Sequence, residues 1–326
     1  MKKCTSISFV ALSDSTDGLL LLFPIQIARG GWGTNEHMIA PCNPWSTEGT
    51  QLTCGGSSSG SGASVSSYTV PCAVGTDTGG SVRTPAALCG IVGLKTTKGM
   101  LPTDGIVPLS HSFDTPGPMA RSVADCTIMC AAMMEPEEGK KFEIAFKESI
   151  QEGVKGLRFA CIGEKCRKLI QVEAQLAAFD AALEVLAGLG AEIVEFDWDV
   201  TAFLTNNMSK AEGYFHHKAV VDDPDSEMDR GVRERLKDGK DVTVQEYIEC
   251  DLGRELALGK WLEGMKDCVA WLSPTTASLP ISLKEAVIDL TETKRKAGPF
   301  TRFVNYCGLC AISGNFLCYL QTKRSE

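Results

Sequence analysis

The sequence has no long hydrophobic run. Its longest apolar stretch, residues 19–28, is interrupted by Pro24 and Gln26 and is too short to cross a bilayer. Residues 1–3 (Met-Lys-Lys) precede a short apolar stretch with polar interruptions, and no small-residue cleavage site follows it clearly. A secretory signal is therefore disfavoured, and we expect a cytoplasmic protein that does not insert into a membrane.

An excess of positive charge is also absent. The chain has 32 Lys and Arg residues against 41 Asp and Glu residues, for a net charge of −9. This balance disfavours a general nucleic-acid surface. Most of the 14 cysteines stand singly in apolar surroundings, as reduced buried thiols do, and the one CxxC motif, Cys307 to Cys310, has no second pair. We expect no metal site and no cofactor.

The composition is that of a globular protein. Of the 326 residues, 44% are hydrophobic and 22% are charged, so the chain can bury a large core. Periodicity predicts helices near 61–67, 122–134 and 172–188 and over much of 206–265, and strands near 71–75, 157–162, 191–196 and 271. The apolar stretches 90–94 and 106–109 fit either short strands or buried loops. We predict a single α/β domain with a mixed β-sheet core covered by α-helices.

The segment 55–85 is unusually rich in small residues. Fifteen of its 31 residues are Gly or Ser, but Val65, Tyr68 and Val70 give it an apolar side that a flexible linker would not need. A phosphate-binding loop is disfavoured, because residues 75–80 match GxxxxG without the Lys-Ser/Thr that should follow. A nucleophile elbow centred on Ser58 is disfavoured, because no apolar strand precedes it.

Two motifs at the ends of this segment carry a family resemblance. Residues 55–58 (Gly-Gly-Ser-Ser) and 75–85 (Gly-Thr-Asp-Thr-Gly-Gly-Ser-Val-Arg-Thr-Pro) together resemble the amidase signature family of serine hydrolases, including the 24-residue spacing from Ser57 to Ser81. Further segments that resemble the family are 33–36, 43–45, 89–97, 114–125, 273–276 and 303–306. The resemblance covers about residues 31–313 and is densest over 55–125.

The resemblance implies a catalytic role for both serines. Ser81 would be the nucleophile, and Ser57 would be a bridging serine that follows a cis peptide bond and relays a proton. Thr78, Gly79 and Gly80 would direct backbone N–H groups at the oxyanion that develops on the substrate carbonyl. Glycine permits this close approach because it has no Cβ.

Three further residues would support the site. Ser58 follows the bridging serine directly. Asp77 and Arg83 are close enough in sequence to form an ion pair that braces the loop between them. A role for Arg83 in holding a substrate carboxylate is the alternative to this structural role.

The third catalytic residue of the family, a lysine, has no counterpart that we can identify. It belongs upstream of the first serine, where this chain has only Lys2 and Lys3, and Lys95 and Lys98 follow the nucleophile. We therefore divide the chain into an atypical N-terminal segment (1–30), an incomplete amidase domain (31–313) and an atypical C-terminal tail (314–326). Both ends differ from the family as they would after truncation.

These observations lead to one functional expectation and one alternative. We expect an amidase-type serine hydrolase that cleaves a C–N bond of a small-molecule amide through an acyl-enzyme, impaired by the missing lysine. The alternative is a non-catalytic amidase-like remnant or a subunit of an amidotransferase-type complex. Homo-oligomerisation stays open.

Overall fold

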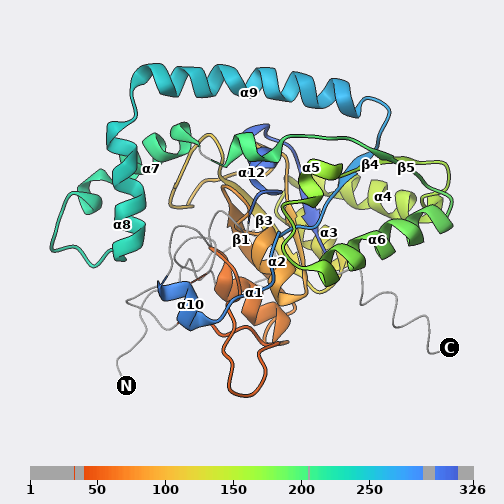
Figure 1. The fold of residues 1–326 in the computed structure, drawn as a ribbon, viewed down its shortest axis with the longest axis horizontal. Coiled ribbons are helices and arrows are strands. Elements are labelled where there is room, and N and C mark those ends of the chain that lie inside the picture. The colour runs from red at the N-terminus through yellow and green to blue at the C-terminus, as the bar shows by residue number, and fades with distance from the viewer. Residues whose placement is uncertain (1–32, 34–39, 205, 289–297, 315–326) are drawn as a thin grey trace.

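The computed structural model describes residues 33, 40–204, 206–288 and 298–314, which form a mixed α/β structure around two sheets (Figure 1). The expected N-terminal segment (1–30) and all but the first residue of the expected tail (314–326) lie outside the described residues. None of the helices in the described ranges combines the length and the apolar character that a membrane span requires. The predicted single α/β domain with helices over its sheets is confirmed.

The first sheet is antiparallel and carries the candidate site. Its strands lie in the order β1 (Cys72–Asp77), β3 (Thr115–Ala120), β2 (Val92–Lys95) and β7 (Ala311–Ser313). β3 is a central strand although it contains Pro116 and Pro118. β2 pairs with β3 only at Met119 and Ala120, which follow both prolines. The β2–β3 ladder therefore does not need the N–H groups that the two prolines lack.

Two short helices pack on this sheet and begin at the two serine motifs. They are α1 (Ser59–Ser66) and α2 (Arg83–Cys89). Small residues bring α2 close to β2, since a Cβ added at Gly93 would lie 2.7 Å from the Cβ of Ala86. Val65, Val82 and Met119 fill the core between these elements. The small-residue composition of the Gly/Ser segment therefore serves close packing.

The second sheet is parallel. β4 (Arg158–Cys161) lies between β5 (Glu192–Glu195) and β6 (Ala270–Leu272), and α6 (Glu173–Gly188) connects β4 to β5. Leu189 and Gly190 follow the helix as predicted. An aromatic cluster that includes Trp198, Trp261 and Phe303 packs beside this sheet.

The remaining elements are helical. They are α3 (Val123–Ala132), α4 (Pro136–Glu152), α5 (Glu164–Arg167), the 3₁₀ helices η2 (Val200–Phe203) and η3 (Asp238–Asp241), α7 (Asn207–Val221), α8 (Arg230–Lys237), α9 (Val244–Met265), α10 (Leu283–Ile288) and α12 (Arg302–Tyr306). The predicted cap of α3 is present, because Ser122 Oγ accepts the N–H of Asp125 at 3.0 Å. The segment 106–109 is a loop rather than a strand.

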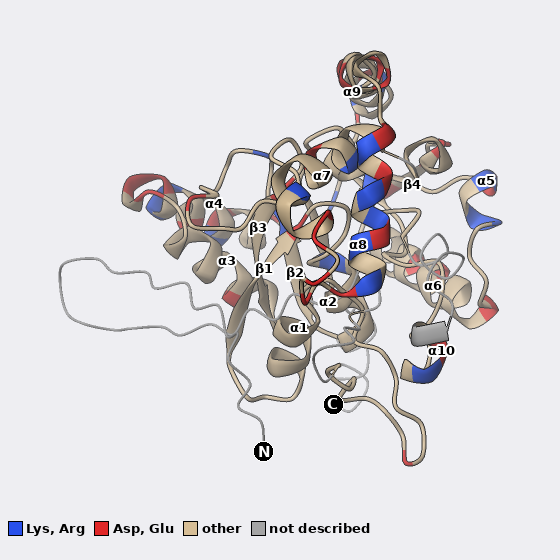
Figure 2. Cartoon of the chain, turned by 90° about the vertical axis from the view of Figure 1, so that its left-hand side faces the viewer, with Lys and Arg blue, Asp and Glu red and all other residues tan. Residues whose placement is uncertain are grey.

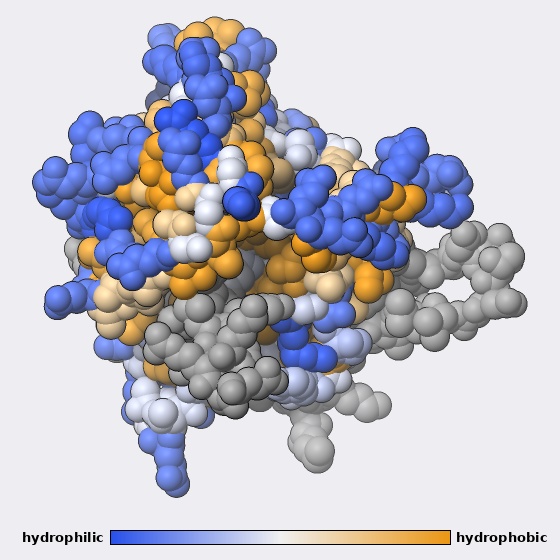
Figure 3. Space-filling model, turned by 90° about the vertical axis from the view of Figure 1, so that its right-hand side faces the viewer, coloured by the Kyte–Doolittle hydropathy of each residue, from blue (hydrophilic) through white to orange (hydrophobic). Residues whose placement is uncertain are grey.

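Charge is distributed unevenly over these elements. Lys, Arg, Asp and Glu cover most of α8, whereas α1 carries no charged residue (Figure 2). Hydrophobic side chains are exposed between hydrophilic ones on the side that carries α6 and the C-terminal end of α9 (Figure 3). Exposed apolar residues of these elements and their flanks are Leu189, Leu262 and Val269.

Candidate active site

The two serine motifs meet in space. The Gly56–Ser57 peptide bond is cis. Ser58, the N-cap of α1, donates its backbone N–H to the carbonyl oxygen of Ser81 at 3.2 Å. Ser57 and Ser81 are both half-buried, and each lies two residues before the first residue of its helix. The structure thus joins two turns that lie 24 residues apart in the sequence.

Ser58 fixes the first turn to β1. Its Oγ accepts the N–H of Thr76 at 3.2 Å and lies 3.3 Å from the carbonyl oxygen of Thr76, to which it donates. Gly75 makes room for this hydroxyl, because a Cβ at that position would lie 2.8 Å from the Oγ of Ser58. Ser58 is fully engaged with the backbone, so it serves as a structural support of the turn.

Asp77 braces the loop that presents Ser81. Its carboxylate accepts the N–H of Gly80 at 2.7 Å and that of Val82 at 3.2 Å. Arg83 donates Nε and Nη2 to the same carboxylate at 3.0 Å each, so the predicted ion pair is present. Burial acts to raise the pKa of Asp77, but the charge and hydrogen bonds of Arg83 outweigh it and lower this pKa well below its usual range.

Asn305 completes this brace, and the sequence did not assign it a role. From α12, its Nδ2 donates to Asp77 Oδ1 at 2.9 Å and to the Asp77 carbonyl oxygen at 3.0 Å. Its Oδ1 accepts Nη2 of Arg83 at 2.6 Å. The only signal in the sequence was the weak family-like segment 303–306.

The backbone N–H groups of the loop before Ser81 differ in whether they are free to donate to an oxyanion. The N–H of Gly80 is donated to Asp77, which differs from the expectation that Gly80 supplies an oxyanion donor. Among the described residues, no acceptor takes the N–H of Gly79 or of Ser81. Gly80 has φ = 122°, and a Cβ there would lie 2.5 Å from Thr301 Oγ1. Position 80 therefore requires glycine, both for its backbone conformation and because a side chain would clash with Thr301.

Thr78 is held by a second residue that the sequence did not assign, Asp114. Thr78 Oγ1 donates to Asp114 Oδ1 at 2.5 Å. The other carboxylate oxygen accepts the N–H groups of Leu109 and Ser110 at 2.7 and 2.8 Å. Asp114 therefore ties the loop 109–114 to the turn before Ser81 through the Thr78 side chain. The expected role of the Thr78 N–H as an oxyanion donor stays a prediction.

The lysines near the first sheet donate their hydrogen bonds to backbone carbonyl oxygens away from the two serines. Lys95 is 0% exposed and donates Nζ to the carbonyl oxygens of Leu309 at 2.7 Å and Thr96 at 2.9 Å. Lys98 Nζ donates to the carbonyl oxygen of Asp114 at 2.9 Å. In the described part of the chain, no lysine forms a hydrogen bond with Ser57 or Ser81.

The buried position of Lys95 predicts an unusual pH dependence of stability. Burial lowers the pKa of Lys95 to about 8. Between pH 8 and about 10.4 the unfolded chain binds the proton that the folded chain has lost, so rising pH stabilises the folded state. We compare the free energies of unfolding of wild type and Lys95→Met, measured in urea at pH 7 and at pH 10.5. Over this interval we expect wild type to gain on the order of 3 kcal/mol of stability relative to the variant. Parallel pH profiles for the two proteins would contradict this prediction.

Comparisons with known proteins identify the family of this chain. The Amidase family profile matches residues 26–323. The chain belongs to this family. Among curated amidase relatives, 2-amino-5-chloromuconic acid deaminase of Comamonas testosteroni is 32% identical over 89% of this chain. A glutamyl-tRNA(Gln) amidotransferase subunit of Clostridium botulinum is 30% identical over 88% of it. The chain spans 62% and 65% of the lengths of these two relatives.

Solved amidase-family structures share the fold. A protein of a vestigial complex connected with the origins of an s-triazine catabolic enzyme superposes with a TM-score of 0.76 at 25% identity, over 90% of this chain and 66% of its own. The corresponding glutamyl-tRNA(Gln) amidotransferase subunit of Thermotoga maritima gives a TM-score of 0.65 at 29% identity, over 84% of this chain and 60% of its own.

Metal ligands are not gathered in the described residues of this amidase-family chain. No group of three or more His, Cys, Asp or Glu side chains there is arranged to hold a metal ion. In the CxxC motif, Cys307 is buried and Cys310 is exposed.

Proposed function

We propose that this chain carries the nucleophile half of an amidase active site and acts on the C–N bond of a small-molecule amide. The observation that supports this most directly is the hydrogen bond from Ser58 N–H to the Ser81 carbonyl, which holds the Ser57 and Ser81 turns together. Neither a metal nor a cofactor takes part in the proposed reaction, and the proposed location is the cytoplasm. None of the described cysteines is paired in a disulfide, which supports that location.

The proposed reaction begins with the attack of Ser81 Oγ on the amide carbonyl carbon. The N–H groups of Gly79 and Ser81 stabilise the oxyanion, the C–N bond breaks, and the amine leaves with the proton that Ser57 relays. Water then hydrolyses the Ser81 ester, which releases the carboxylate and restores the serine.

The proton relay is the weak part of this site. Ser57 can pass a proton on, but a hydroxyl is a poor base, so the relay needs a further acceptor. The 326-residue chain has only Lys2 and Lys3 before Ser57, and both lie outside the described residues. We therefore propose impaired catalysis for this chain by itself.

A non-catalytic role in an amidotransferase-type complex is the second candidate. It is favoured by the lack of an identified base and by relatives that are named as subunits of glutamyl-tRNA(Gln) amidotransferase. The acidic net charge gives no support to direct nucleic-acid binding. The exposed apolar residues near α6 and α9 leave room for a partner or a second copy of the chain.

The assignment of Ser81 is tested by covalent labelling. We expect a fluorophosphonate probe, incubated for hours at pH 9, to modify Ser81 in preference to every other serine. Hydroxide assists deprotonation at this pH, so the test does not depend on the missing base. Peptide mapping by mass spectrometry identifies the labelled residue.

Two variants sharpen this test. Ser81→Ala should abolish the labelling, whereas Ser67→Ala, which changes an exposed serine at the end of α1, should leave it intact. Labelling of another serine, or no labelling at all, would contradict the proposed nucleophile.

A further inference from the structure

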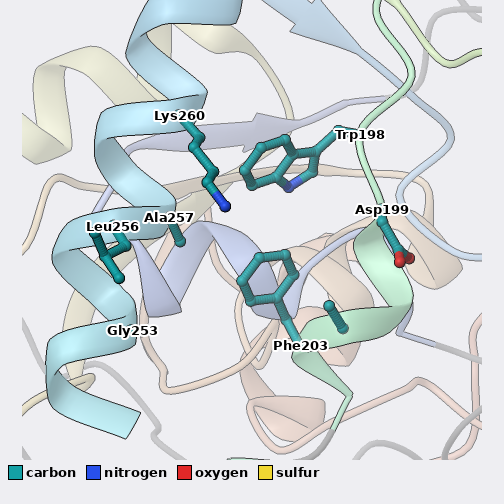
Figure 4. Close-up of a pocket in the computed structure, with 8 residues that line it drawn as sticks. Trp198, Asp199, Phe203, Gly253, Leu256, Ala257 and Lys260 are labelled. Carbon is teal, nitrogen blue, oxygen red and sulfur yellow. The ribbon is translucent and has the colours of Figure 1, made fainter. Parts of the chain in front are cut away.

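A groove of about 390 Å³ lies between α9 and η2, formed by residues that the proposed reaction does not use (Figure 4). Its volume falls at the lower end of the range of small-molecule sites, about 300–1,000 Å³. α9 lies along the outer edge of the molecule in Figures 1 and 2, so the groove opens beside an exposed helix.

The walls of the groove are apolar. The rings of Trp198 and Phe203 stack on one side, with centroids 5.7 Å apart and planes 13° apart. Ala257 of α9 projects toward these rings, and Leu256 of the same helix also lines the groove (Figure 4). Leu256 is 68% exposed, so this wall is accessible to a ligand from solvent. Flat aromatic and aliphatic walls of this kind suit a small apolar body.

One positive charge points into this apolar space. The side chain of Lys260 extends from α9 toward Trp198, with its amino group above Phe203 (Figure 4). None of the described residues forms an ion pair or a hydrogen bond with Lys260. The ammonium group therefore has donors available for a ligand at the edge of the apolar walls.

One carboxylate also lines the groove and is engaged with the backbone of η2. Asp199 lies on the opposite side from Lys260 (Figure 4). Its Oδ1 accepts the N–H of Thr201 at 3.0 Å and the Oγ1 of Thr201 at 2.6 Å, which caps η2. The Asp199 carboxylate keeps its negative charge, so a ligand carboxylate is attracted only to the Lys260 side of the groove.

We propose that this groove binds a small organic carboxylate with an apolar body. The carboxylate pairs with the Lys260 ammonium, and the aliphatic or aromatic part lies between the Trp198–Phe203 stack and Leu256. Each half of such a ligand meets a matching surface, because the exposed Lys260 ammonium lies at the edge of the apolar walls. The proposal does not depend on Ser81 or on amide hydrolysis.

Octanoate is a suitable probe for this site. We expect saturable binding of octanoate to the full chain, measured by isothermal titration calorimetry and by a change in tryptophan fluorescence. Lys260→Glu should weaken octanoate binding by about tenfold or more, because it replaces attraction by repulsion. The same variant should strengthen binding of octylammonium, which has the same tail and the opposite charge.

Two further variants separate this groove from unspecific binding. Lys266→Glu makes the same charge change at the C-cap of the same helix, where the lysine pairs with Glu263 and does not line the groove. This variant should leave octanoate affinity unchanged. Ala257→Phe should fill the groove and abolish binding. The proposal is overturned if octanoate does not bind, if it binds Lys260→Glu as well as wild type, or if Ala257→Phe leaves its affinity unchanged.

Discussion

Replacing Arg83 by Met is expected to lower the free energy of unfolding by about 3–5 kcal/mol, because it leaves the Asp77 carboxylate buried without its counter-charge. The two side chains are only 3% and 0% exposed, so water cannot substitute for the guanidinium. The hydrogen bonds from Gly80 and Asn305 remain in the variant, but neither group carries a charge. Urea unfolding followed by tryptophan fluorescence measures the loss.

An exposed ion pair provides the matched control for this prediction. Lys141 and Glu138 on α4 pair at 2.7 Å with side chains 70% and 64% exposed. Lys141→Met should change the free energy of unfolding by less than about 1 kcal/mol. The double variant Asp77→Asn/Arg83→Met should be less destabilised than Arg83→Met, because it removes the unpaired charge. A loss below about 1 kcal/mol in Arg83→Met would show that the brace is not the source of stability described above.

Hydrolysis of simple amides by the 326-residue chain is expected to be 10²- to 10⁴-fold slower than by a related amidase with its lysine in place, a range set by the loss of a general base. This range corresponds to about 3–5 kcal/mol of activation free energy. An activated ester needs no proton on its leaving group, so the N–H groups of Gly79 and Ser81 should still support slow ester turnover. Initial rates on p-nitrophenyl acetate and on benzamide measure the contrast.

Two outcomes decide this prediction. Ser81→Ala should remove the slow esterase activity, and Ser67→Ala should retain it. Rapid amide turnover that Ser81→Ala abolishes would mean that a lysine of this chain reaches Ser57 after all. Ester turnover equal in wild type and Ser81→Ala would argue instead for the non-catalytic role within a complex.

The secondary structure that depends on local pattern could be predicted from the sequence. The small-residue helix α1, the strand β1 and the βαβ unit around α6 all lie where periodicity placed them. β3 was not predicted, because Pro116 and Pro118 argue against a central strand unless the register of its neighbour is known. That register depends on the tertiary structure, which periodicity does not report.

In the candidate site, too, the local features could be predicted from the sequence and the long-range contacts could not. Ser57, Ser81, Asp77 and Arg83 lie within one short segment, so their spacing made the two motifs and the ion pair predictable. The contribution of Asn305 arises from the packing of α12 against this segment, and the weak family-like segment 303–306 does not say which residues Asn305 would contact. The direction of the Gly80 N–H depends on the loop conformation. The sequence does not determine that conformation, because glycine permits many backbone dihedral angles.

The brace also determines when the site can form during synthesis. Asp77 and Asn305 are 228 residues apart, so the ribosome releases the serine motifs long before the residue that completes their support. Until α12 emerges, the carboxylate and guanidinium lack one of their buried partners and the loop before Ser81 lacks its covering helix. Contacts of such long sequence separation form late, because the entropy of closing the intervening chain must be overcome first. A nascent chain shorter than about 300 residues would therefore carry both serine motifs without a folded candidate site.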